Sequence, residues 1–433
     1  MRITSVQPGD SLWAIARRHG VTVDEMIRVN GLEAQANRLV PGQALLVPIR
    51  EIVHTVGAGE TLWSIANRYG VSPDAIAHMN GISNPAMIYP GAQLRIPGTN
   101  AAAQPKMTIE VNGYLQLKGT ERDRQIVQDT ARQLTYFSLF QYVAGADGSL
   151  TPPPKPIPTL EAIAKTNAVP MMVVTNFKDG TFSAEIAHAV FTNALAREKL
   201  IHNIEQTLMT NQYYSLNVDF EHIYPDDRDL YTDFLKELTG RVHALGKPIS
   251  TAVAPKTSAE QSGPWYTAHD YGAHGAIVDF VILMTYEWGW SGGPPMAVAP
   301  IPQVKRVLDY ALTVIPRHKI ILSAPLYGYN WTLPYKPGGK FAPTLSPEAA
   351  VKLAYDVGAY IQYDPTALAP FFRYYDKEGL EHIVWFEDAR SMQAKFNLIK
   401  QYNLRGISYW VLGQPFTQNW MLLEANFNVK KVK

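Results

Sequence analysis

The segment Tyr213–Asp227 reads YYSLNVDFEHIYPDD, and polar and apolar residues alternate along its middle. Asn217, Asp219 and Glu221 are the polar members of this alternation. Because successive side chains of a β-strand point to opposite faces, the three polar side chains are expected to share one face. A strand that places an amide and two carboxylates on one face is either solvated there or part of a functional site, and the surrounding sequence distinguishes these alternatives.

From residue 108 onward, strand-like apolar segments alternate with helical patterns. The expected strands are residues 108–115, 134–143, 169–177, 213–221, 248–255, 276–287, 319–329 and 405–412. The helical patterns between them include residues 123–134, 229–245, 303–315 and 392–403. This alternation predicts an α/β fold, a (β/α)8 TIM barrel over residues 108–433, in preference to a doubly wound sheet. The gap between the last two strands is much longer than the others, so a small α+β insertion is expected at about residues 331–387.

In a closed barrel the strand face toward the helices must be apolar, so the polar face of the fourth strand is expected to point inward. Catalytic groups of such barrels lie at the carboxyl ends of the strands. Two buried carboxylates this close repel each other, which raises the pKa of one and keeps it protonated as an acid. A salt-bridged strand end is the alternative for an isolated acidic pair. Tyr286 and Trp410, on the sixth and eighth strands, favour a functional site because a phenol and an indole suit a sugar ring.

About the first hundred residues form a tandem repeat. VQPGDSLWAIARRHGVTVDEMIRVNGL aligns with VGAGETLWSIANRYGVSPDAIAHMNGI, and VPGQALLVPI later aligns with YPGAQLRIPG. Each copy predicts a strand–helix–helix–strand unit. Leu12 and Ile15 begin an apolar helix stripe that ends at Gly20, and Thr22 with Glu25 forms a capping-box pattern for the second helix.

The two repeats are expected to occupy residues 2–49 and 52–98. The small residues and proline of 99–107 then predict a linker to the barrel. Trp13 and Trp63, which occupy equivalent positions in the two copies, are expected to be core residues because they lie on the apolar helix segments.

The composition excludes several classes of protein. Of 433 residues, 46% are hydrophobic and 18% charged, which indicates a folded protein with a substantial core. The net charge of +1 gives no field that would attract nucleic acid, and the absence of cysteine excludes disulfides and thiolate metal sites. No apolar run is long enough for a membrane span, and the N-terminus lacks the apolar core of a signal peptide. The 11 histidines lack ligand spacing, so no metal or cofactor is expected, and His222 is interpreted as structural, on the strand face opposite Glu221.

Two family resemblances follow from these motifs. The repeated G-[DE]-[ST]-L-W-x-I-A run, the N-G pair and the P-G-x-x-L-x-[VI]-P ending resemble the LysM module, a family that binds N-acetylglucosamine-containing polymers such as peptidoglycan and chitin. The barrel resembles glycoside hydrolase family 18, whose fourth strand carries D-G-x-D-x-D-x-E. Here the motif reads YSLNVDFE, so its last Asp and Glu are kept while Tyr214, Ser215 and Asn217 replace the earlier residues. Glu287 stands where the family usually has Asp.

Two LysM modules ahead of a barrel with an N-x-D-[FW]-E motif are similar to a spore cortex-lytic N-acetylglucosaminidase group within family 18. The resemblance implies hydrolysis of N-acetylglucosaminyl linkages in spore cortex peptidoglycan during germination. It also implies a location in the spore of an endospore-forming bacterium, with peptidoglycan glycan strands as the partner. We expect a monomer. A chitinase and a non-catalytic, carbohydrate-binding spore coat protein are the alternatives.

The resemblance implies a substrate-assisted, retaining mechanism in which the acetamido group of the substrate is the nucleophile. Glu221 would be the general acid and base, Asp219 would hold the acetamido N–H, and Tyr286 would donate to the acetamido oxygen. Asn217 would hydrogen-bond Asp219 without sharing its charge, and Trp410 would form the floor under the −1 sugar. The other residues expected to line the cleft are Tyr114, Phe140, Asn176, Glu287 and Gln414.

Overall fold

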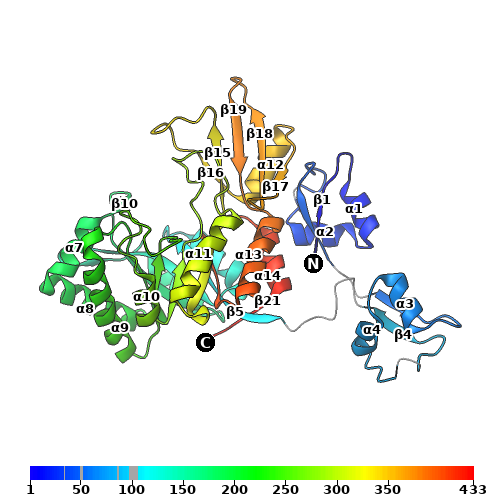
Figure 1. Cartoon of the computed structure of the whole chain (residues 1–433), viewed down its shortest axis with the longest axis horizontal. Helices are drawn as coiled ribbons and strands as arrows, with labels where there is room; N and C mark the ends of the chain where they lie inside the picture. The colour runs from blue at the N-terminus through cyan, green and yellow to red at the C-terminus, as the bar shows by residue number, and fades with distance from the viewer. Residues whose placement is uncertain (34, 49–51, 85–86, 97–105) are drawn as a thin grey trace.

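The computed structural model describes residues 1–33, 35–48, 52–84, 87–96 and 106–433. Most of the predicted linker, residues 99–107, lies outside the described residues. Figure 1 shows two small units at the N-terminal end of the chain, a large barrel, and a sheet that rises from one rim of the barrel.

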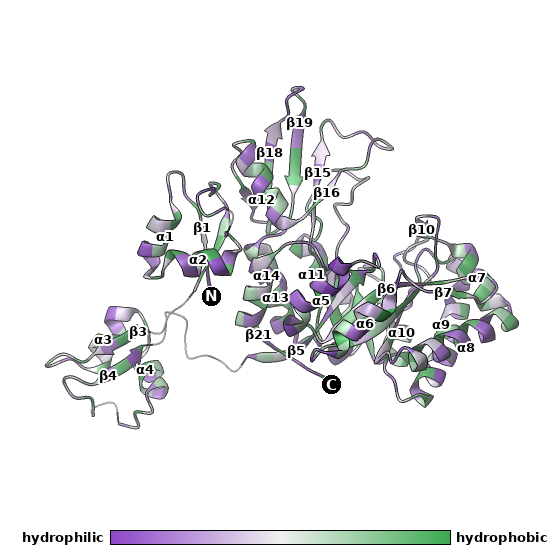
Figure 2. Ribbon diagram, turned by 180° about the vertical axis from the view of Figure 1, so that it is seen from behind, coloured by the Kyte–Doolittle hydropathy of each residue, from purple (hydrophilic) through white to green (hydrophobic). Residues whose placement is uncertain are grey.

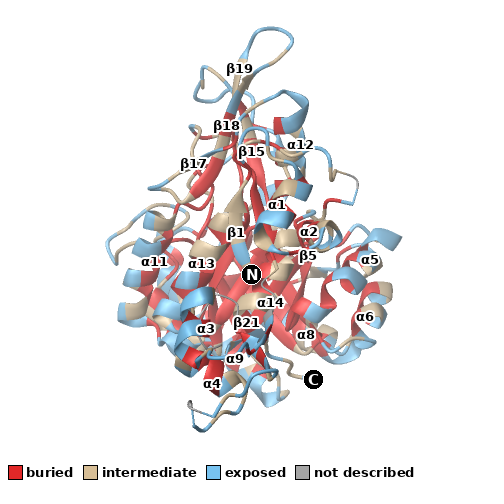
Figure 3. Cartoon of the chain, turned by 90° about the vertical axis from the view of Figure 1, so that its right-hand side faces the viewer, coloured by how far each residue is buried: buried red, intermediate tan, exposed pale blue. Residues whose placement is uncertain are grey.

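Eight parallel strands form the barrel, and each pairs with the next in chain order until the last pairs with the first. They are β5 (Met107–Gln116), β6 (Tyr136–Ala144), β8 (Val169–Thr175), β11 (Ser215–Asp219), β12 (Ile249–Val253), β13 (Phe280–Leu283), β14 (Ile320–Pro325) and β20 (Gly406–Trp410). The strands are buried at the centre of the domain (Figure 3). The predicted (β/α)8 fold is confirmed.

Helices cover the outside of the barrel (Figure 2), and their buried apolar residues belong to one cluster with residues of the strands. They are α5 (Glu121–Thr130), α6 (Pro156–Ala164), α7 (Ala184–Thr192), α8 (Ala194–Thr210), α9 (Arg228–Ala244), α10 (Tyr271–Ile277), α11 (Ile301–Val314), α13 (Ala389–Tyr402) and α14 (Thr417–Asn426). In α9, for example, Tyr231, Leu235 and Leu238 recur at helical spacing and are fully buried. Within the described ranges, no helix combines the length and apolar character that a membrane span requires.

The sixth strand is shorter than predicted. The sequence predicts a strand over residues 276–287, whereas β13 covers only Phe280–Leu283. The first residues of the predicted segment belong to α10, because the side chain of Asp270 accepts a hydrogen bond from the Ala273 N–H and starts a helix there. A short apolar run fits a buried helix end as well as a buried strand, so periodicity alone does not separate the two.

The predicted insertion lies between β14 and β20. It is a five-stranded antiparallel sheet in the order β16-β15-β19-β18-β17, with one helix against it. Its elements are β15 (Gly328–Thr332), β16 (Thr344–Leu345), α12 (Pro347–Asp356), β17 (Gln362–Asp364), β18 (Ala369–Tyr375) and β19 (Glu381–Trp385). It stands above the barrel rim that carries the strand ends (Figure 1).

Each N-terminal repeat has the predicted strand–helix–helix–strand order. The first contains β1 (Arg2–Ser5), α1 (Leu12–His19), α2 (Val23–Asn30) and β2 (Ala44–Val47), and the second contains β3 (Ile52–Thr55), α3 (Leu62–Tyr69), α4 (Pro73–Met79) and β4 (Gln93–Ile96). The predicted caps are present: Gly20 follows α1 with φ of 67°, and Thr22 and Glu25 form the capping box of α2.

The prediction that Trp13 and Trp63 are core residues is wrong. Their side chains are 61% and 69% exposed. In α1, Leu12 and Ile15 are buried, and a residue one position along a helix turns by about 100° away from that stripe. Trp13 therefore lies beside Arg17, whose guanidinium carbon is 5.3 Å from the centre of the indole ring.

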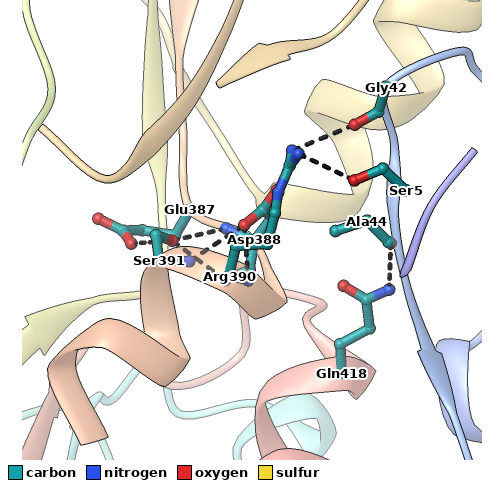
Figure 4. Close-up of polar contacts among 8 residues, drawn as sticks. All are labelled: Ser5, Gly42, Ala44, Glu387, Asp388, Arg390, Ser391 and Gln418. Atoms are coloured by element: carbon teal, nitrogen blue, oxygen red, sulfur yellow. Dashed lines mark hydrogen bonds and ion pairs between the residues drawn. The ribbon is translucent and has the colours of Figure 1, made fainter. Parts of the chain in front are cut away.

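The first repeat is packed against the barrel (Figure 4). Arg390 of α13 donates to the Gly42 carbonyl at 3.1 Å and to Ser5 Oγ at 3.3 Å, and Gln418 of α14 donates to the Ala44 carbonyl at 2.8 Å. Val29, Ala44 and Leu46 of the repeat are buried in the same apolar cluster as the barrel core. This repeat and the barrel therefore share a core.

Candidate active site

A cleft of about 770 Å³ opens at the carboxyl ends of the barrel strands. It is bounded on one side by the insertion, through Tyr329 and Thr344. The predicted site residues that line it are Tyr114, Phe140, Asp219, Glu221, Tyr286, Glu287, Trp410 and Gln414. The topology thus brings together residues from five different parts of the chain, as the carboxyl ends of barrel strands do.

The alternating face of the fourth strand points inward. Asp219 ends β11, and Glu221 lies two residues further on, beyond the strand. Their exposed fractions are 4% and 8%, so both carboxyl groups reach the cleft from a largely buried position. Because apolar Val218 and Phe220 point the other way into the helix layer, the two acids are fixed on the same side of the backbone.

Burial raises the pKa of both acids. For Asp219 burial alone raises the pKa to about 7. For Glu221 burial is again the main cause, the charge of Asp219 adds to it, and the pKa lies well above the ordinary value. Within the described residues, Asp219 Oδ1 is buried without a hydrogen-bond partner. The pair is therefore suited to hold one proton on Glu221 while Asp219 keeps an oxygen available to a donor.

Asn217 does not reach the cleft, although the sequence predicts it as a substrate-binding residue. It is fully buried below Asp219. Its Oδ1 accepts a hydrogen bond from the Tyr114 hydroxyl at 2.9 Å, and its Nδ2 donates to Ser250 Oγ at 3.0 Å. Both ends of the amide form hydrogen bonds inside the barrel, so Asn217 links Tyr114 to Ser250 beneath the cleft.

Asn176 is also placed behind the cleft wall instead of on it. Its Nδ2 donates to the Glu221 carbonyl at 2.8 Å and to the Ser183 carbonyl at 2.9 Å, and its Oδ1 accepts from the Glu221 N–H at 3.0 Å. A single amide thus satisfies both backbone groups of Glu221. Asn176 fixes the main chain that carries the acid.

The sixth strand contributes a phenol and a third acid. Tyr286 is buried, and burial, with the charges of Asp219 and Glu221, raises the pKa of its hydroxyl well above the ordinary value, so it remains a donor. Glu287 has φ of 67° and accepts hydrogen bonds from the hydroxyls of Tyr327 and Tyr329, the latter at 2.8 Å. These two tyrosines begin the insertion and were not predicted as site residues from the sequence.

Aromatic rings form one wall of the cleft. The Trp410 ring centre lies 5.5 Å from that of Tyr114 and 4.8 Å from that of Phe140, both in edge-to-face contact. Gln414 lines the cleft beyond them. The indole is held by its neighbours and remains in the cleft lining, as a platform for a sugar ring requires.

Trp265 is a further cleft residue that was not predicted from the sequence. It lies in the loop after β12, outside any periodic element, and its indole Nε1 donates to Glu221 Oε2 at 2.5 Å. The prediction that His222 lies on the strand face opposite Glu221 also needs correction. β11 has already ended, His222 has φ of 52°, and its exposed imidazole stacks on Trp265 with ring centres 6.0 Å apart. The Gly-Pro before Trp265 marks a loop, but no local sequence signal indicates that its tryptophan contacts Glu221.

No group of three or more His, Cys, Asp or Glu side chains with metal-binding geometry occurs in the part of the chain that the structure describes.

Comparisons with known proteins agree with this architecture. The sequence model of the glycosyl hydrolases family 18 matches residues 99–414, and that of the LysM domain matches residues 5–48 and 54–97. The cortical fragment-lytic enzyme of Bacillus subtilis (strain 168) is 47% identical over 435 residues, covering 100% of this chain and 99% of that protein. The cortical fragment-lytic enzyme of Bacillus cereus is 44% identical with the same coverage.

Solved structures show the same likeness. The spore cortex-lytic enzyme SleL of Bacillus megaterium QM B1551 superposes with a TM-score of 0.87 at 42% identity, covering 100% of this chain and 99% of that one. A chitinase from Chromobacterium violaceum ATCC 12472 has a TM-score of 0.69 at 26% identity and covers 74% of this chain and 99% of its own. The chain belongs to glycoside hydrolase family 18 and carries two LysM domains ahead of its barrel.

Proposed function

We propose that this protein hydrolyses N-acetylglucosaminyl linkages in spore cortex peptidoglycan by substrate-assisted, retaining catalysis. The observation that carries the proposal is the pair of buried acids, Asp219 and Glu221, which face the cleft with raised pKa values and without a cationic partner among the described residues. A buried acid pair that is not neutralised is costly to keep, and it is expected where one acid must stay protonated.

In the first step Glu221 donates its proton to the glycosidic oxygen of the leaving sugar. The carbonyl oxygen of the 2-acetamido group attacks the anomeric carbon as the bond to the leaving oxygen breaks, which forms a cyclic oxazolinium. Asp219 accepts a hydrogen bond from the acetamido N–H and stabilises the positive charge that develops there. Tyr286 donates its hydroxyl to the acetamido oxygen and fixes its approach.

In the second step the ionised Glu221 takes a proton from a water molecule. The water oxygen bonds to the anomeric carbon, and the bond between that carbon and the oxazolinium oxygen breaks. This restores the N-acetyl group and leaves the anomeric carbon with retained configuration. Trp410 supports the face of the −1 sugar during both steps. Since the nucleophile is the acetamido group itself, a glycan without N-acetyl groups is not a substrate.

The substrate is proposed from the relatives. Those named as cortical fragment-lytic and spore cortex-lytic enzymes match over essentially the whole chain, including both LysM domains. The chitinase covers 74% of this chain. We propose that the protein acts in the spore, that its action belongs to germination, and that the LysM domains hold the glycan. Tandem weak sites raise avidity on a repeating polymer.

The test is mass analysis of the fragments released from decoated-spore cortex by the wild type and by Glu221→Gln. New reducing-end N-acetylglucosamine is expected with the wild type alone. Release of reducing-end muramic acid would contradict the glucosaminidase specificity. Cleavage of chitin oligosaccharides combined with no action on cortex would favour a chitinase, and binding without cleavage of either glycan would make the barrel a binding module.

A further inference from the structure

The carboxyl group of Glu221 is held at one of its two oxygens. Oε2 accepts the hydrogen bond from Trp265 Nε1, while Oε1 has no hydrogen-bond partner among the described residues. The backbone of Glu221 is fixed independently by Asn176. The side chain therefore has one defined orientation, and the tryptophan alone sets it.

Trp265 is itself held by contacts that lead back to the fourth strand. Its indole stacks on His222, the next residue after Glu221, with an interplanar angle of 9°. Its loop is tied down by the buried His269, whose Nδ1 accepts from the Ala254 N–H at 2.8 Å. Nε2 of His269 consequently carries the proton and donates to the carbonyl of Phe220 at 2.9 Å. The loop that carries Trp265 thus contacts the residues on both sides of Glu221, Phe220 and His222.

On the basis of the function proposed above, we propose that Trp265 is a positioning residue for the general acid. Its N–H holds Oε2, so that the proton is carried on Oε1 and points toward the leaving oxygen. When that proton has been transferred, the same N–H faces the new negative charge on the carboxylate. A donor aimed at charge that develops in the transition state accelerates the step that creates it.

The electrostatic surroundings make this donor important. Burial and the charges of Asp219 and Glu287 raise the pKa of Glu221, and the Trp265 N–H is the contact that opposes them. The titratable groups that interact electrostatically with Glu221 from the surrounding elements are Asp219, Glu287, Tyr286, Tyr114 and Tyr231. These are acids or phenols, so none of them replaces the tryptophan as a source of positive potential.

The test is Trp265→Phe in the full-length protein, assayed on cortex fragments and on a chromogenic N-acetylglucosaminide across a range of pH. This variant keeps an aromatic ring for stacking and removes the N–H together with part of the indole. We expect kcat to fall roughly 10- to 100-fold with little change in KM, because the contact acts in the transition state. The alkaline limb of the pH–rate profile should move to higher pH, because the pKa of Glu221 rises without its donor.

Two further variants separate positioning from folding. Trp331→Phe removes an indole N–H that donates to the Gly293 carbonyl at 3.0 Å, away from Glu221, and should keep the wild-type profile. His222→Leu removes the stacking ring and should move the alkaline limb in the same direction as Trp265→Phe, by less.

The outcomes are distinct. A wild-type rate and profile in Trp265→Phe would overturn this inference, as would a lower kcat with an unmoved alkaline limb and a lower melting temperature. Either result leaves the proposed function standing if Glu221→Gln is inactive. An active Glu221→Gln variant would overturn the proposed function and this inference together.

Discussion

Two buried acidic sites in the same domain are built in opposite ways. Glu387 lies between the insertion and α13, and its Oε2 accepts hydrogen bonds from the buried Lys395 ammonium at 2.7 Å and from Ser391 Oγ at 2.5 Å (Figure 4 shows the serine contact). Asp219 and Glu221 are buried nearly as deeply at the barrel mouth, yet no cation pairs with them among the described residues. Both sites contain carboxylates out of water, and only the first provides a counter-charge.

The difference separates a structural acid from a reactive one. Burial raises the pKa of Glu387, but the charge of Lys395 and the hydrogen bonds from Lys395 and Ser391 counteract that effect. At Asp219 burial acts without opposition. A paired buried charge holds helices together, whereas an unpaired one stores free energy that a substrate can release by supplying the missing donor.

The largest expected effect is the loss of activity in Glu221→Gln. The amide has the same shape and cannot transfer a proton, so the rate on cortex fragments should fall roughly 10²- to 10⁴-fold. The melting temperature should stay the same or rise, because a buried ionisable group is removed. The matched change at the other site, Glu387→Gln, should keep activity and lower the melting temperature. Equal effects of the two variants on activity and on melting temperature would contradict the distinction between a reactive and a structural acid.

Breaking the paired site should cost stability. Lys395→Met leaves Glu387 buried without its cation, and loss of one partner of a buried ion pair lowers the free energy of unfolding by about 3–5 kcal/mol. Urea unfolding measures this change. The double variant Lys395→Met/Glu387→Gln should recover much of the loss, since it removes the uncompensated charge. A double variant as unstable as the single one would show that packing, not charge, governs this site.

Adding a third acid should change the titration of the unpaired site. In Asn217→Asp the new carboxyl lies below Asp219, where the Asn217 amide bonds Tyr114 and Ser250 and not Asp219. A second buried negative charge raises the pKa of Asp219, so the acid limb of the pH–rate profile should move up by about one pH unit. Asn217→Ser, which introduces no charge, is the control. A profile that stays in place would indicate that residue 217 and Asp219 titrate independently.

The smallest expected effect is on the pH dependence of stability. The pKa of Asp219 is about 7 in the folded protein against an ordinary 3.8, so the folded state binds this proton more tightly. Its contribution to stability is fully present at low pH and is lost as the pH rises toward 7. Relative to Asp219→Asn, the wild type should therefore lose about 2 °C or more of melting temperature between pH 4 and pH 7. Parallel curves for the two proteins would contradict a raised pKa.

The parts of the molecule that follow from periodicity were predictable. The alternation of Asn217, Asp219 and Glu221 with apolar residues predicted a strand with a polar inner face, and the structure has that strand. The repeat predicted two copies of one unit because each helix cap uses a local rule. Such features depend on residues close together in sequence, which is why a single chain reveals them.

The parts that depend on long-range contacts were not predictable. Trp265 meets Glu221 across 44 positions, and no local pattern marks such a contact. Asn176 and Asn217 were expected in the cleft because they are polar and near strand ends, but short amides can instead satisfy buried neighbours. Trp13 was expected in the core because it lies in an apolar helix segment, although its position on that helix faces solvent.

The packing of the first repeat on the barrel has a consequence for how the molecule melts. Ala44 and Leu46 of the first repeat are buried in the barrel cluster, whereas the equivalent residues of the second repeat, Gln93 and Arg95, are exposed. Each repeat has an apolar cluster of its own, and among the described residues only the first repeat also contributes buried residues to the barrel cluster. Calorimetry should therefore show one heat-absorption peak for the first repeat together with the barrel and another for the second repeat. The first LysM domain thus unfolds with the barrel and the second unfolds by itself. The boundaries between cooperative unfolding units therefore differ from the boundaries between homologous domains.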